Sequence, residues 1–576
     1  MKRELNHITV LKVVAGITLV AIAFAANGLI FTFSINQNRV TMRDGYKLYT
    51  RIYFPPNWTM ENGSRPVILE RTAYNCARAD FVALGQSFAN QGYIGVVQDV
   101  RGAWGSRGSV PFQVYHTEGP DGVDTVNWIL AQPWCNGNIA TSGSSGDAAT
   151  ELYGHAAGEN VKAAFINVGA ADLYDQWIFT GGCFQKWFMD VWLPGVDGLG
   201  YYQTLFDHAA KDDWWAATSV TMNDNARNVH PRAVHFGGWY DCFQQGTIDS
   251  FMWYNKNGTD YAKGHQILVM GPVFHGGNDH PSVNYSMVDD GSSYAYAAQD
   301  FIFGESLWGE ARNWSAQPRV YYIVMGDPDS VDPRVNEWRT AMDWPIPSTK
   351  EAWYFHENGT LSNSTPSTPA NLSYVYDPID PVLNGGGTTF MINATRYTGT
   401  VDPLLRIGAY DNKLVEANRS DILKFRTPVL TAPVEIIGRI RATLNVMSNC
   451  TDTDFTAKLL DIYPDGREII VADGILKTRY RDGFRSNETA LMVPGNVYTL
   501  DVDLWSMAYR FTPGHQIQVS ISSSNYPEFA ANPNTGGAVT SWGLGDPVTI
   551  PYYHANNTVL LGQGATPSCI WFSRTE

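Results

Sequence analysis

Residues 138–149 constrain the fold of this 576-residue chain more than any other stretch, because an extended run meets a serine between small residues and then a helix-favouring tail. Small residues on both sides of Ser145 permit a sharp turn from strand to helix that lifts the serine hydroxyl into solvent. Glycines at 143 and 146 suit this turn, and a helix beginning near Gly146 would direct its N-terminal amides at developing negative charge. The pattern is typical of a nucleophile elbow, with Ser145 as the nucleophile.

The elbow departs from the strict G-x-S-x-G spacing, because Asp147 stands where the last glycine is expected. Two other interpretations therefore stay open. A Gly/Ser-rich turn before a helix would have the same residues without any chemistry, and Ser144 could be the nucleophile in place of its neighbour.

Apolar runs of strand length alternate with helical patterns around the elbow. The runs lie at residues 66–71, 93–98, 163–168, 233–238 and 266–271, and the helical patterns at 81–91 and 121–130. Continuous apolar runs are typical of parallel strands buried on both faces. The alternation predicts a doubly wound α/β sheet, in which ligand chemistry gathers at the carboxyl ends of the strands.

An acid and a histidine follow two of these predicted strands. Asp241 comes shortly after one strand and His275 after the next, which gives the chain order Ser145, Asp241, His275 expected of an α/β-hydrolase. In such a triad His275 would accept the serine proton, and Asp241 would orient the imidazole and stabilise its charged form. Position and order select His275 over three other histidines near strand ends, which are His235, His265 and His280.

The remaining chain predicts two further units. Residues 172–223 are rich in aromatic residues without a clear strand, which indicates an inserted helical cap whose aromatics either pack a core or line an apolar pocket. Beyond residue 350 short strands and Gly/Pro/Asn turns replace helices, as in a β-sandwich of jelly-roll type. The expected organisation is a signal segment (1–33), an α/β-hydrolase core in two parts (36–171 and 224–345), the cap (172–223) and a jelly-roll domain (350–576).

The N-terminal segment resembles a secretory signal. Lys2, Arg3 and Lys12 precede an uncharged run over residues 13–33, for which we favour cleavage, with an uncleaved membrane anchor as the alternative. Thirteen sequons then indicate a secreted or cell-surface glycoprotein. They are Asn57, Asn62, Asn257, Asn284, Asn313, Asn358, Asn363, Asn371, Asn393, Asn418, Asn449, Asn487 and Asn556.

Charge and cysteine content limit the classes of partner and cofactor that we expect. The formal net charge of −16 argues against a nucleic-acid partner, since phosphate binding needs a surplus of Lys and Arg. The six cysteines are compatible with disulfides and show no metal-ligand spacing. We expect neither a metal nor an organic cofactor, and an oligomer stays possible.

Several motifs in one order resemble the family of the bacterial cocaine esterase and the X-prolyl dipeptidyl-peptidases, over residues 40–534. The motifs are Arg43-Asp44-Gly45, Gln98-Asp99-Val100-Arg101-Gly102, Trp134-Cys135-Asn136-Gly137-Asn138, Gly237-Gly238-Trp239-Tyr240-Asp241, Gly271-Pro272 with His275, Tyr463-Pro464-Asp465-Gly466-Arg467, and Asn532-Pro533-Asn534-Thr535-Gly536. The resemblance implies a serine hydrolase with an α/β core, a helical cap and a C-terminal jelly roll.

The resemblance also implies roles for individual residues. Ser145, Asp241 and His275 would form the triad, Tyr74 would be a phenolic oxyanion-hole donor, and the backbone N–H of Gly146 would be the second donor. The elbow differs from the family pattern, which has an aromatic residue after the serine and a glycine two residues further on.

Three functions are consistent with the sequence. The leading hypothesis is a secreted serine hydrolase that cleaves esters through an acyl-enzyme, with an apolar acyl or aryl group under the cap. An X-prolyl dipeptidyl-peptidase or α-amino-acid ester hydrolase is the second, because Asp172, Asp175 and Asp190 could pair with a substrate ammonium. A catalytically silent binding module on the cell surface is the third.

Overall fold

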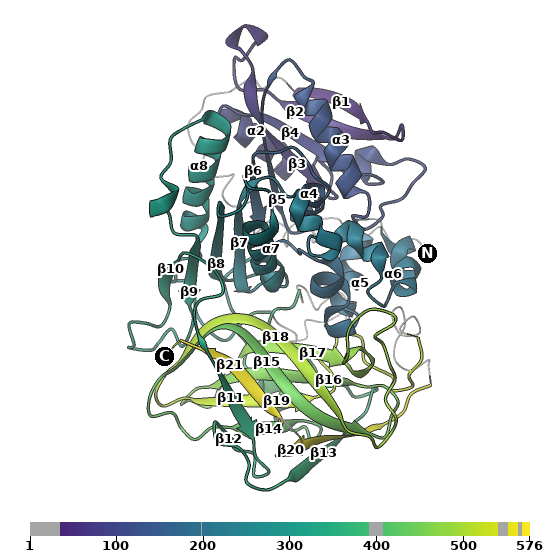
Figure 1. Cartoon of the computed structure of the whole chain (residues 1–576), viewed down its shortest axis with the longest axis vertical. Coiled ribbons are helices and arrows are strands. Elements are labelled where there is room, and N and C mark those ends of the chain that lie inside the picture. Colours follow the sequence, from purple (N-terminus) through teal and green to yellow (C-terminus); the bar gives the residue numbers. More distant parts are fainter. Residues whose placement is uncertain (1–34, 197, 391–406, 539–550, 563–566, 576) are drawn as a thin grey trace, which may run out of the picture.

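The computed structural model describes residues 35–196, 198–390, 407–538, 551–562 and 567–575. The α/β part and the all-β part are stacked along the longest axis of the molecule (Figure 1). The predicted signal segment and the sequon at Asn393 lie outside the described residues. Within the described ranges, no helix has the length and apolar character needed to cross a membrane.

A ten-stranded sheet forms the centre of the α/β part, in the order β1-β2-β4-β3-β5-β6-β7-β8-β9-β10. Its strands are β1 (Ile35–Thr41), β2 (Lys47–Tyr53), β3 (Arg65–Thr72), β4 (Ile94–Asp99), β5 (Cys135–Ser144), β6 (Ala163–Asn167), β7 (Arg232–Tyr240), β8 (Gln266–Phe274), β9 (Val320–Val324) and β10 (Glu337–Ala341). Strands β4 to β9 in this order run parallel. Every residue of β4 is buried, as expected of a central parallel strand.

Helices cover both faces of this sheet. They are α2 (Ala79–Asn90), α3 (Glu118–Leu130), α4 (Gly146–Ala156), α7 (Gln244–Asn257) and α8 (Ser292–Trp308). Apolar residues of α2 and α8 share one buried cluster, while α4 and α7 contribute to another and are joined by a hydrogen bond between His155 and Tyr254. The predicted α/β alternation is confirmed.

Short helices make up the segment between β6 and β7. They are η4 (Tyr174–Ile178), η5 (Thr180–Gly182), α5 (Lys186–Gly195), η6 (Leu199–Tyr201), α6 (Tyr202–Asp207), η7 (Asp213–Thr218) and η8 (Met222–Asn228). Most aromatics here pack a core, since Trp177, Phe179 and Trp215 are fully buried. The exact limits of the cap stay a prediction.

The C-terminal part consists of two antiparallel sheets, which confirms the expected all-β domain. One sheet contains β11 (Thr349–Phe355), β12 (Leu361–Ser362), β13 (Ala370–Tyr376), β15 (Val434–Ser448), β18 (Tyr498–Phe511), β20 (Ala555–Leu561) and β21 (Cys569–Arg574); the other contains β14 (Leu423–Arg426), β16 (Asp454–Ile462), β17 (Glu468–Lys477) and β19 (Gln516–Ser522). The expectation that helices vanish after residue 350 is wrong in detail, because α10 (Lys413–Glu416) and η10 (Thr478–Tyr480) interrupt the strands.

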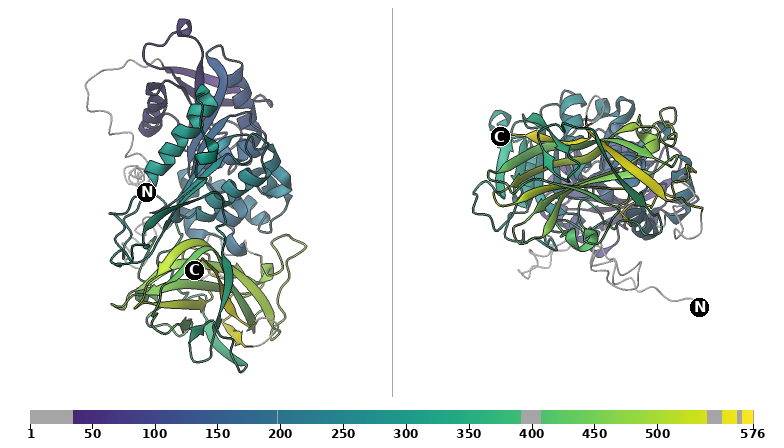
Figure 2. Two further views of the ribbon diagram at one scale, coloured as in Figure 1. Left: turned by 60° about the vertical axis from the view of Figure 1, so that its left-hand side comes forward. Right: turned by 90° about the horizontal axis from the view of Figure 1, so that it is seen from below.

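The two parts pack directly against each other (Figure 2). Tyr240, the last residue of β7, donates its hydroxyl proton to the carbonyl of Ile470 at 2.8 Å, and Ser506 donates to Gln245 at 2.8 Å. A single apolar cluster contains residues of β7, β8 and both C-terminal sheets. The all-β part therefore supports the end of the central sheet where strands β7 and β8 finish.

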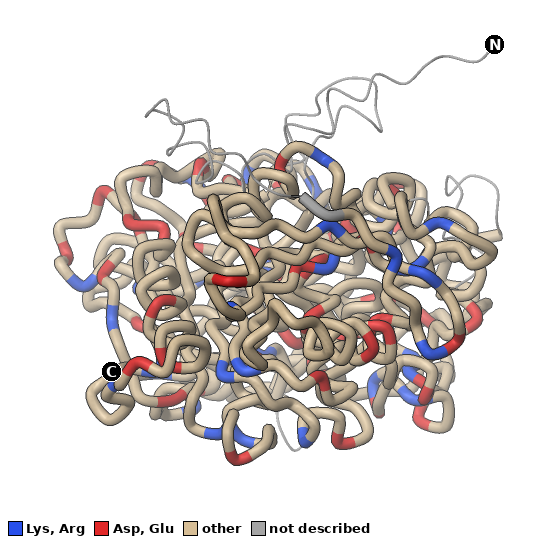
Figure 3. The backbone as a smooth tube through the Cα atoms, turned by 90° about the horizontal axis from the view of Figure 1, so that it is seen from above, with Lys and Arg blue, Asp and Glu red and all other residues tan. Residues whose placement is uncertain are grey.

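Charged residues and thiols are dispersed through the structure. Lys and Arg are interspersed with Asp and Glu over the face seen in Figure 3. All six cysteines are free thiols, so the disulfides that the sequence allowed do not form.

Candidate active site

The predicted elbow is a sharp turn between two regular elements. Strand β5 ends at Ser144 and α4 begins at Gly146, while Ser145 between them has φ 59° and ψ −122°. A non-glycine residue with positive φ is strained and persists only where its surroundings impose it. The Ser145 amide donates to Asn167 at 3.0 Å, which ties the turn to β6. A Cβ at Gly143 would lie 2.6 Å from the Asp147 carbonyl oxygen, so only glycine permits this close approach.

Ser145, His275 and Asp241 form a continuous chain of contacts. Ser145 Oγ lies 2.9 Å from His275 Nε2, and His275 Nδ1 lies 2.8 Å from Asp241 Oδ2. Asp241 is fully buried and accepts a further bond from the Phe243 amide at 2.7 Å, which fixes the carboxylate. With its proton on Nδ1, His275 leaves Nε2 free to accept the serine proton.

The strands reach further than the apolar runs predict. Strand β7 continues to Tyr240 and β8 to Phe274, so Asp241 and His275 are the first residues after their strands. The parallel register of β5 to β8 brings these strand ends together at one edge of the sheet.

The competing residues have other partners. Ser144 accepts a hydrogen bond from Asn167 at 2.9 Å. His235 is fully buried between Ser250 and Gln266. His280 contacts the Pro272 carbonyl and the Ala409 amide, and His265 contacts the Lys263 carbonyl, so neither lies in the chain of contacts at Ser145.

Tyr74 and Gly146 lie side by side next to Ser145. A Cβ at Gly146 would be 2.4 Å from Tyr74 Oη, which shows how closely the phenol approaches the elbow. Burial raises the pKa of Tyr74, so its hydroxyl is a neutral donor at physiological pH. The Gly146 amide, as the first N–H of α4, has no acceptor within its helix. These two donors fit an oxyanion hole.

Trp192 completes the surroundings of Tyr74 in a way that sequence reasoning missed. Its indole Nε1 donates to Tyr74 Oη at 3.0 Å. The sequence places Trp192 among the cap aromatics. Its hydrogen bond to Tyr74 could not be predicted from spacing, because the two residues are 118 positions apart.

Aromatic rings form a connected array from Tyr74 to His275. The indole of Trp192 lies 4.7 Å from that of Trp177, which lies 4.6 Å from Phe243. Phe243 contacts the His275 ring edge-on at 5.5 Å, and Phe390 does so at 5.1 Å. The position of Phe243 near His275 could be predicted from the sequence, since it follows Asp241 by two positions. That of Phe390 could not, because it lies far from both residues in the chain.

Each of the three acidic cap residues pairs with a lysine, and two of them share one. Lys211 Nζ lies 3.0 Å from Asp172 Oδ2 and also pairs with Asp175. Lys186 Nζ lies 2.5 Å from Asp190 Oδ2. None of these carboxylates is left without a cation in the free protein.

Asp147, where the elbow departs from the expected pattern, is one of several buried carboxyl groups near the turn. Burial raises the pKa of Asp147, and the nearby Glu70 carboxyl has its pKa raised by burial and by Asp147. Burial also raises the pKa of Glu159 to about 8. Asp147, which stands where the elbow pattern has a glycine, thus lies at the start of α4 among carboxyl groups whose burial favours their neutral form.

Asp241, Cys242 and His275 are the described residues whose potential metal-ligand atoms cluster within 4.8 Å of one another. Two of the three belong to the chain of contacts at Ser145.

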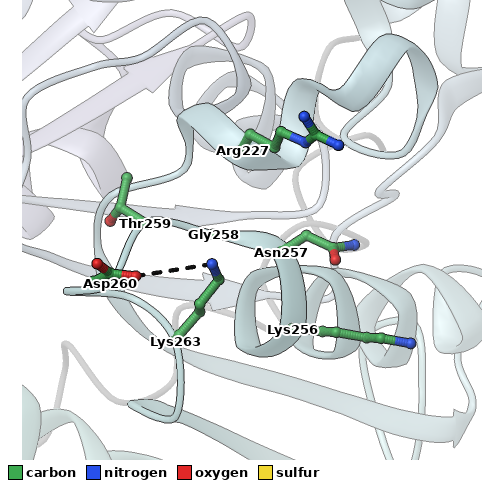
Figure 4. Close-up of a pocket in the computed structure, with 7 residues that line it drawn as sticks. All are labelled: Arg227, Lys256, Asn257, Gly258, Thr259, Asp260 and Lys263. Atoms are coloured by element: carbon green, nitrogen blue, oxygen red, sulfur yellow. Dashed lines mark ion pairs between the residues drawn. The ribbon is translucent and has the colours of Figure 1, made fainter.

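A separate surface hollow lies at the end of α7 (Figure 4). Its lining residues are Arg227, Lys256, Asn257, Gly258, Thr259, Asp260 and Lys263.

The parallel sheet, the strained serine turn and the histidine and acid at adjoining strand ends define the class of α/β serine hydrolases. Comparison with known proteins agrees. The family model of X-Pro dipeptidyl-peptidase (S15 family) matches residues 44–200, and that of the X-Pro dipeptidyl-peptidase C-terminal non-catalytic domain matches residues 312–564. The cocaine esterase of Rhodococcus sp. (strain MB1 Bresler) is 30% identical over 578 residues, covering 88% of this chain and 94% of that protein. The chain belongs to this cocaine esterase and X-Pro dipeptidyl-peptidase family of serine hydrolases.

Solved structures share the fold over nearly the whole chain. An α-amino acid ester hydrolase is similar with a TM-score of 0.73 and 22% identity, covering 96% of this chain and 99% of its own. A CocE/NonD family hydrolase from Staphylococcus aureus is similar with a TM-score of 0.70 and 19% identity, covering 94% of both chains. At these identities the similarity establishes the fold alone, an α/β core followed by an all-β domain.

Proposed function

We propose that this serine hydrolase cleaves carboxylic esters through an acyl-enzyme formed on Ser145. The observation that carries the proposal is the chain of contacts from Ser145 Oγ to His275 to Asp241 at 2.9 and 2.8 Å. These distances suit proton transfer from the serine to the imidazole without rearrangement.

In the acylation step Ser145 Oγ attacks the ester carbonyl carbon while His275 Nε2 takes the hydroxyl proton. The carbonyl oxygen becomes an oxyanion that accepts hydrogen bonds from Tyr74 Oη–H and the Gly146 N–H. Collapse of this intermediate breaks the bond to the leaving alkoxide, which takes the proton from His275. Asp241 keeps the imidazole oriented and stabilises its positive charge throughout.

Water repeats the sequence on the acyl-enzyme. His275 removes a proton from the water as its oxygen attacks the acyl carbon, and the same donors hold the second oxyanion. His275 then returns the proton to Ser145 Oγ, which releases the carboxylic acid and restores the free enzyme.

The aromatic array favours an acyl group that carries an aromatic ring. Phe243 and Phe390 contact His275, and Trp192 contacts Tyr74. Aromatic side chains bind a flat apolar ring through stacked and edge contacts while excluding water. We expect esters of aromatic acids to be better substrates than acetyl esters.

A substrate with a free amine is less well supported. Asp172, Asp175 and Asp190 already pair with Lys211 and Lys186, so an ammonium would have to displace a lysine. We expect N-acetylation of an amino-acid ester to leave its rate largely unchanged. A large loss of rate on acetylation would instead favour the dipeptidyl-peptidase or amino-acid ester hydrolase function.

Hydrolysis of a chromogenic aromatic ester tests the proposal. Activity should be lost in Ser145→Ala and retained in Ser144→Ala, which is the matched control because it removes the neighbouring hydroxyl. Activity that survives Ser145→Ala would refute the assignment. A folded wild-type protein without hydrolytic activity would favour the silent binding module.

We also propose that the protein is secreted and glycosylated. Eleven of the twelve sequon asparagines in the described ranges are exposed, and Asn257, the twelfth, is partly exposed. Asn257 lines the open hollow at the end of α7, where Figure 4 shows its side chain. Treatment of the secreted protein with peptide N-glycosidase should lower its mass, and N-terminal sequencing should find a start after the apolar run. An unchanged mass would refute glycosylation.

A further inference from the structure

We infer that Tyr115 positions the oxyanion donor Tyr74 by presenting its hydroxyl to Tyr74 Oη, and so increases the rate of acylation. This inference rests on the proposed function of Ser145 and Tyr74. It concerns a residue that the elbow, the triad and the aromatic array leave unused, located in the loop between η3 (Trp104–Ser106) and α3.

The hydroxyl of Tyr115 meets that of Tyr74 beside the elbow. A Cβ at Gly146 would lie 2.2 Å from Tyr115 Oη and 2.4 Å from Tyr74 Oη. Both phenol oxygens therefore converge on the same point, and only glycine at position 146 leaves room for them. The absence of a side chain directly after the nucleophile has a structural reason, because the Tyr115 hydroxyl occupies that space.

Tyr115 has an unused donor in a buried position. The residue is fully buried, and its hydroxyl makes no hydrogen bond of ordinary geometry with any described residue. Buried hydroxyls are nearly always paired, so an unpaired one that faces a catalytic group calls for an explanation. The Tyr74 hydroxyl lies beside it, since both oxygens come within 2.4 Å of the position that a Cβ at Gly146 would take.

The backbone around Tyr115 is strained, and packing holds it in place. Val114 has φ 47° and Tyr115 has φ 66°, both in a region that side chains other than glycine seldom adopt. The Tyr115 ring stacks on Trp192 at 5.8 Å and 26° and meets Phe112 edge-on at 5.1 Å. Such strain persists where the surroundings over-determine the conformation, often at functional sites.

Two donors would then act on one phenol oxygen. Trp192 Nε1 already donates to Tyr74 Oη at 3.0 Å, and Tyr115 is placed to supply a second donor. With its lone pairs occupied, Tyr74 must direct its own proton away from both partners and toward the substrate oxygen. Donation into Tyr74 Oη also strengthens the bond that Tyr74 makes to the oxyanion, because hydrogen bonds in a chain polarise one another.

The variant Tyr115→Phe tests this inference, because it removes the hydroxyl and keeps the ring. We expect kcat for an aromatic ester to fall about ten-fold, the effect of one hydrogen bond, with KM unchanged. Counting active sites by phosphonate titration makes the result independent of any misfolded fraction. Tyr153→Phe is the matched control, since Tyr153 is buried beside Tyr115, 6.5 Å between rings, but donates to the Ala170 carbonyl at 3.1 Å. This control should keep kcat.

A double-variant cycle separates a positioning role from a packing role. If Tyr115 acts through Tyr74, then adding Tyr115→Phe to Tyr74→Phe should cause no further loss of kcat. A wild-type kcat in Tyr115→Phe, or an undiminished loss in the Tyr74→Phe background, would overturn the inference. Either result could occur while Ser145→Ala is inactive, so this inference can fail while the proposed function stands.

Discussion

Replacing Tyr74 with phenylalanine removes one hydroxyl from the structure and tests the oxyanion hole. The phenol lies next to Gly146 and receives a hydrogen bond from Trp192 at 3.0 Å. Loss of one oxyanion donor lowers kcat by roughly 10²–10³, about 3–4 kcal/mol of transition-state stabilisation. Because the donor acts on charge that develops only in the transition state, KM should stay unchanged.

The same change has a predictable effect on stability. Trp192 is 7% exposed, so its N–H loses a partner where water has little access. An unpaired buried donor costs about 1–3 kcal/mol, which lowers the unfolding temperature without abolishing the fold. The loss of kcat should therefore appear in protein that is folded at the assay temperature.

The assay measures kcat and KM for an aromatic ester, with active sites counted by phosphonate titration. Tyr202→Phe is the control, because it removes a different buried hydroxyl, which lies in the cap and donates to Asp190 at 2.6 Å. A kcat in Tyr74→Phe within about threefold of wild type, or a rise in KM alone, would refute the role of Tyr74 in the transition state.

Two further predictions concern buried charge. Burial raises the pKa of Glu159 from its ordinary 4.5 to about 8. Between these pH values the native state keeps a proton that the unfolded chain releases, so the free energy of unfolding falls as pH rises. Between these pH values the free energy of unfolding of Glu159→Gln should rise relative to that of wild type by up to about 1.4 kcal/mol per pH unit, as measured by chemical unfolding. A difference in free energy that does not change with pH would contradict this. Lys211→Met leaves Asp172 buried without its cation, which should destabilise the protein by about 3–5 kcal/mol at neutral pH, measured by chemical unfolding. A free energy of unfolding equal to that of wild type would contradict this.

Much of the site could be predicted because its parts follow the order of the strands. Ser145, Asp241 and His275 each come at or near the end of an apolar run, and parallel strands bring such ends together. The role of Tyr74 could be predicted only from the family resemblance, since a tyrosine after a strand does not by itself indicate a catalytic role. The helical cap and the all-β part followed from changes in periodicity.

The rest depended on contacts that spacing does not encode. Trp192 reaches Tyr74 across 118 residues, and Phe390 contacts His275 from another part of the chain. Asp172 and Asp175 were expected to be available to a substrate ammonium, but the fold brings Lys211 to them from a distant position in the sequence. The burial of Asp147 beside the Glu70 carboxyl likewise has no signal in the sequence.

Labelling with a fluorophosphonate, followed by peptide mapping of the adduct, tests the central claim most directly. The probe reacts with a serine only when a base has activated its hydroxyl. The account predicts one adduct, on Ser145, which is absent in Ser145→Ala and present in Ser144→Ala. An adduct on Ser144, or no adduct in protein shown to be folded, would contradict it.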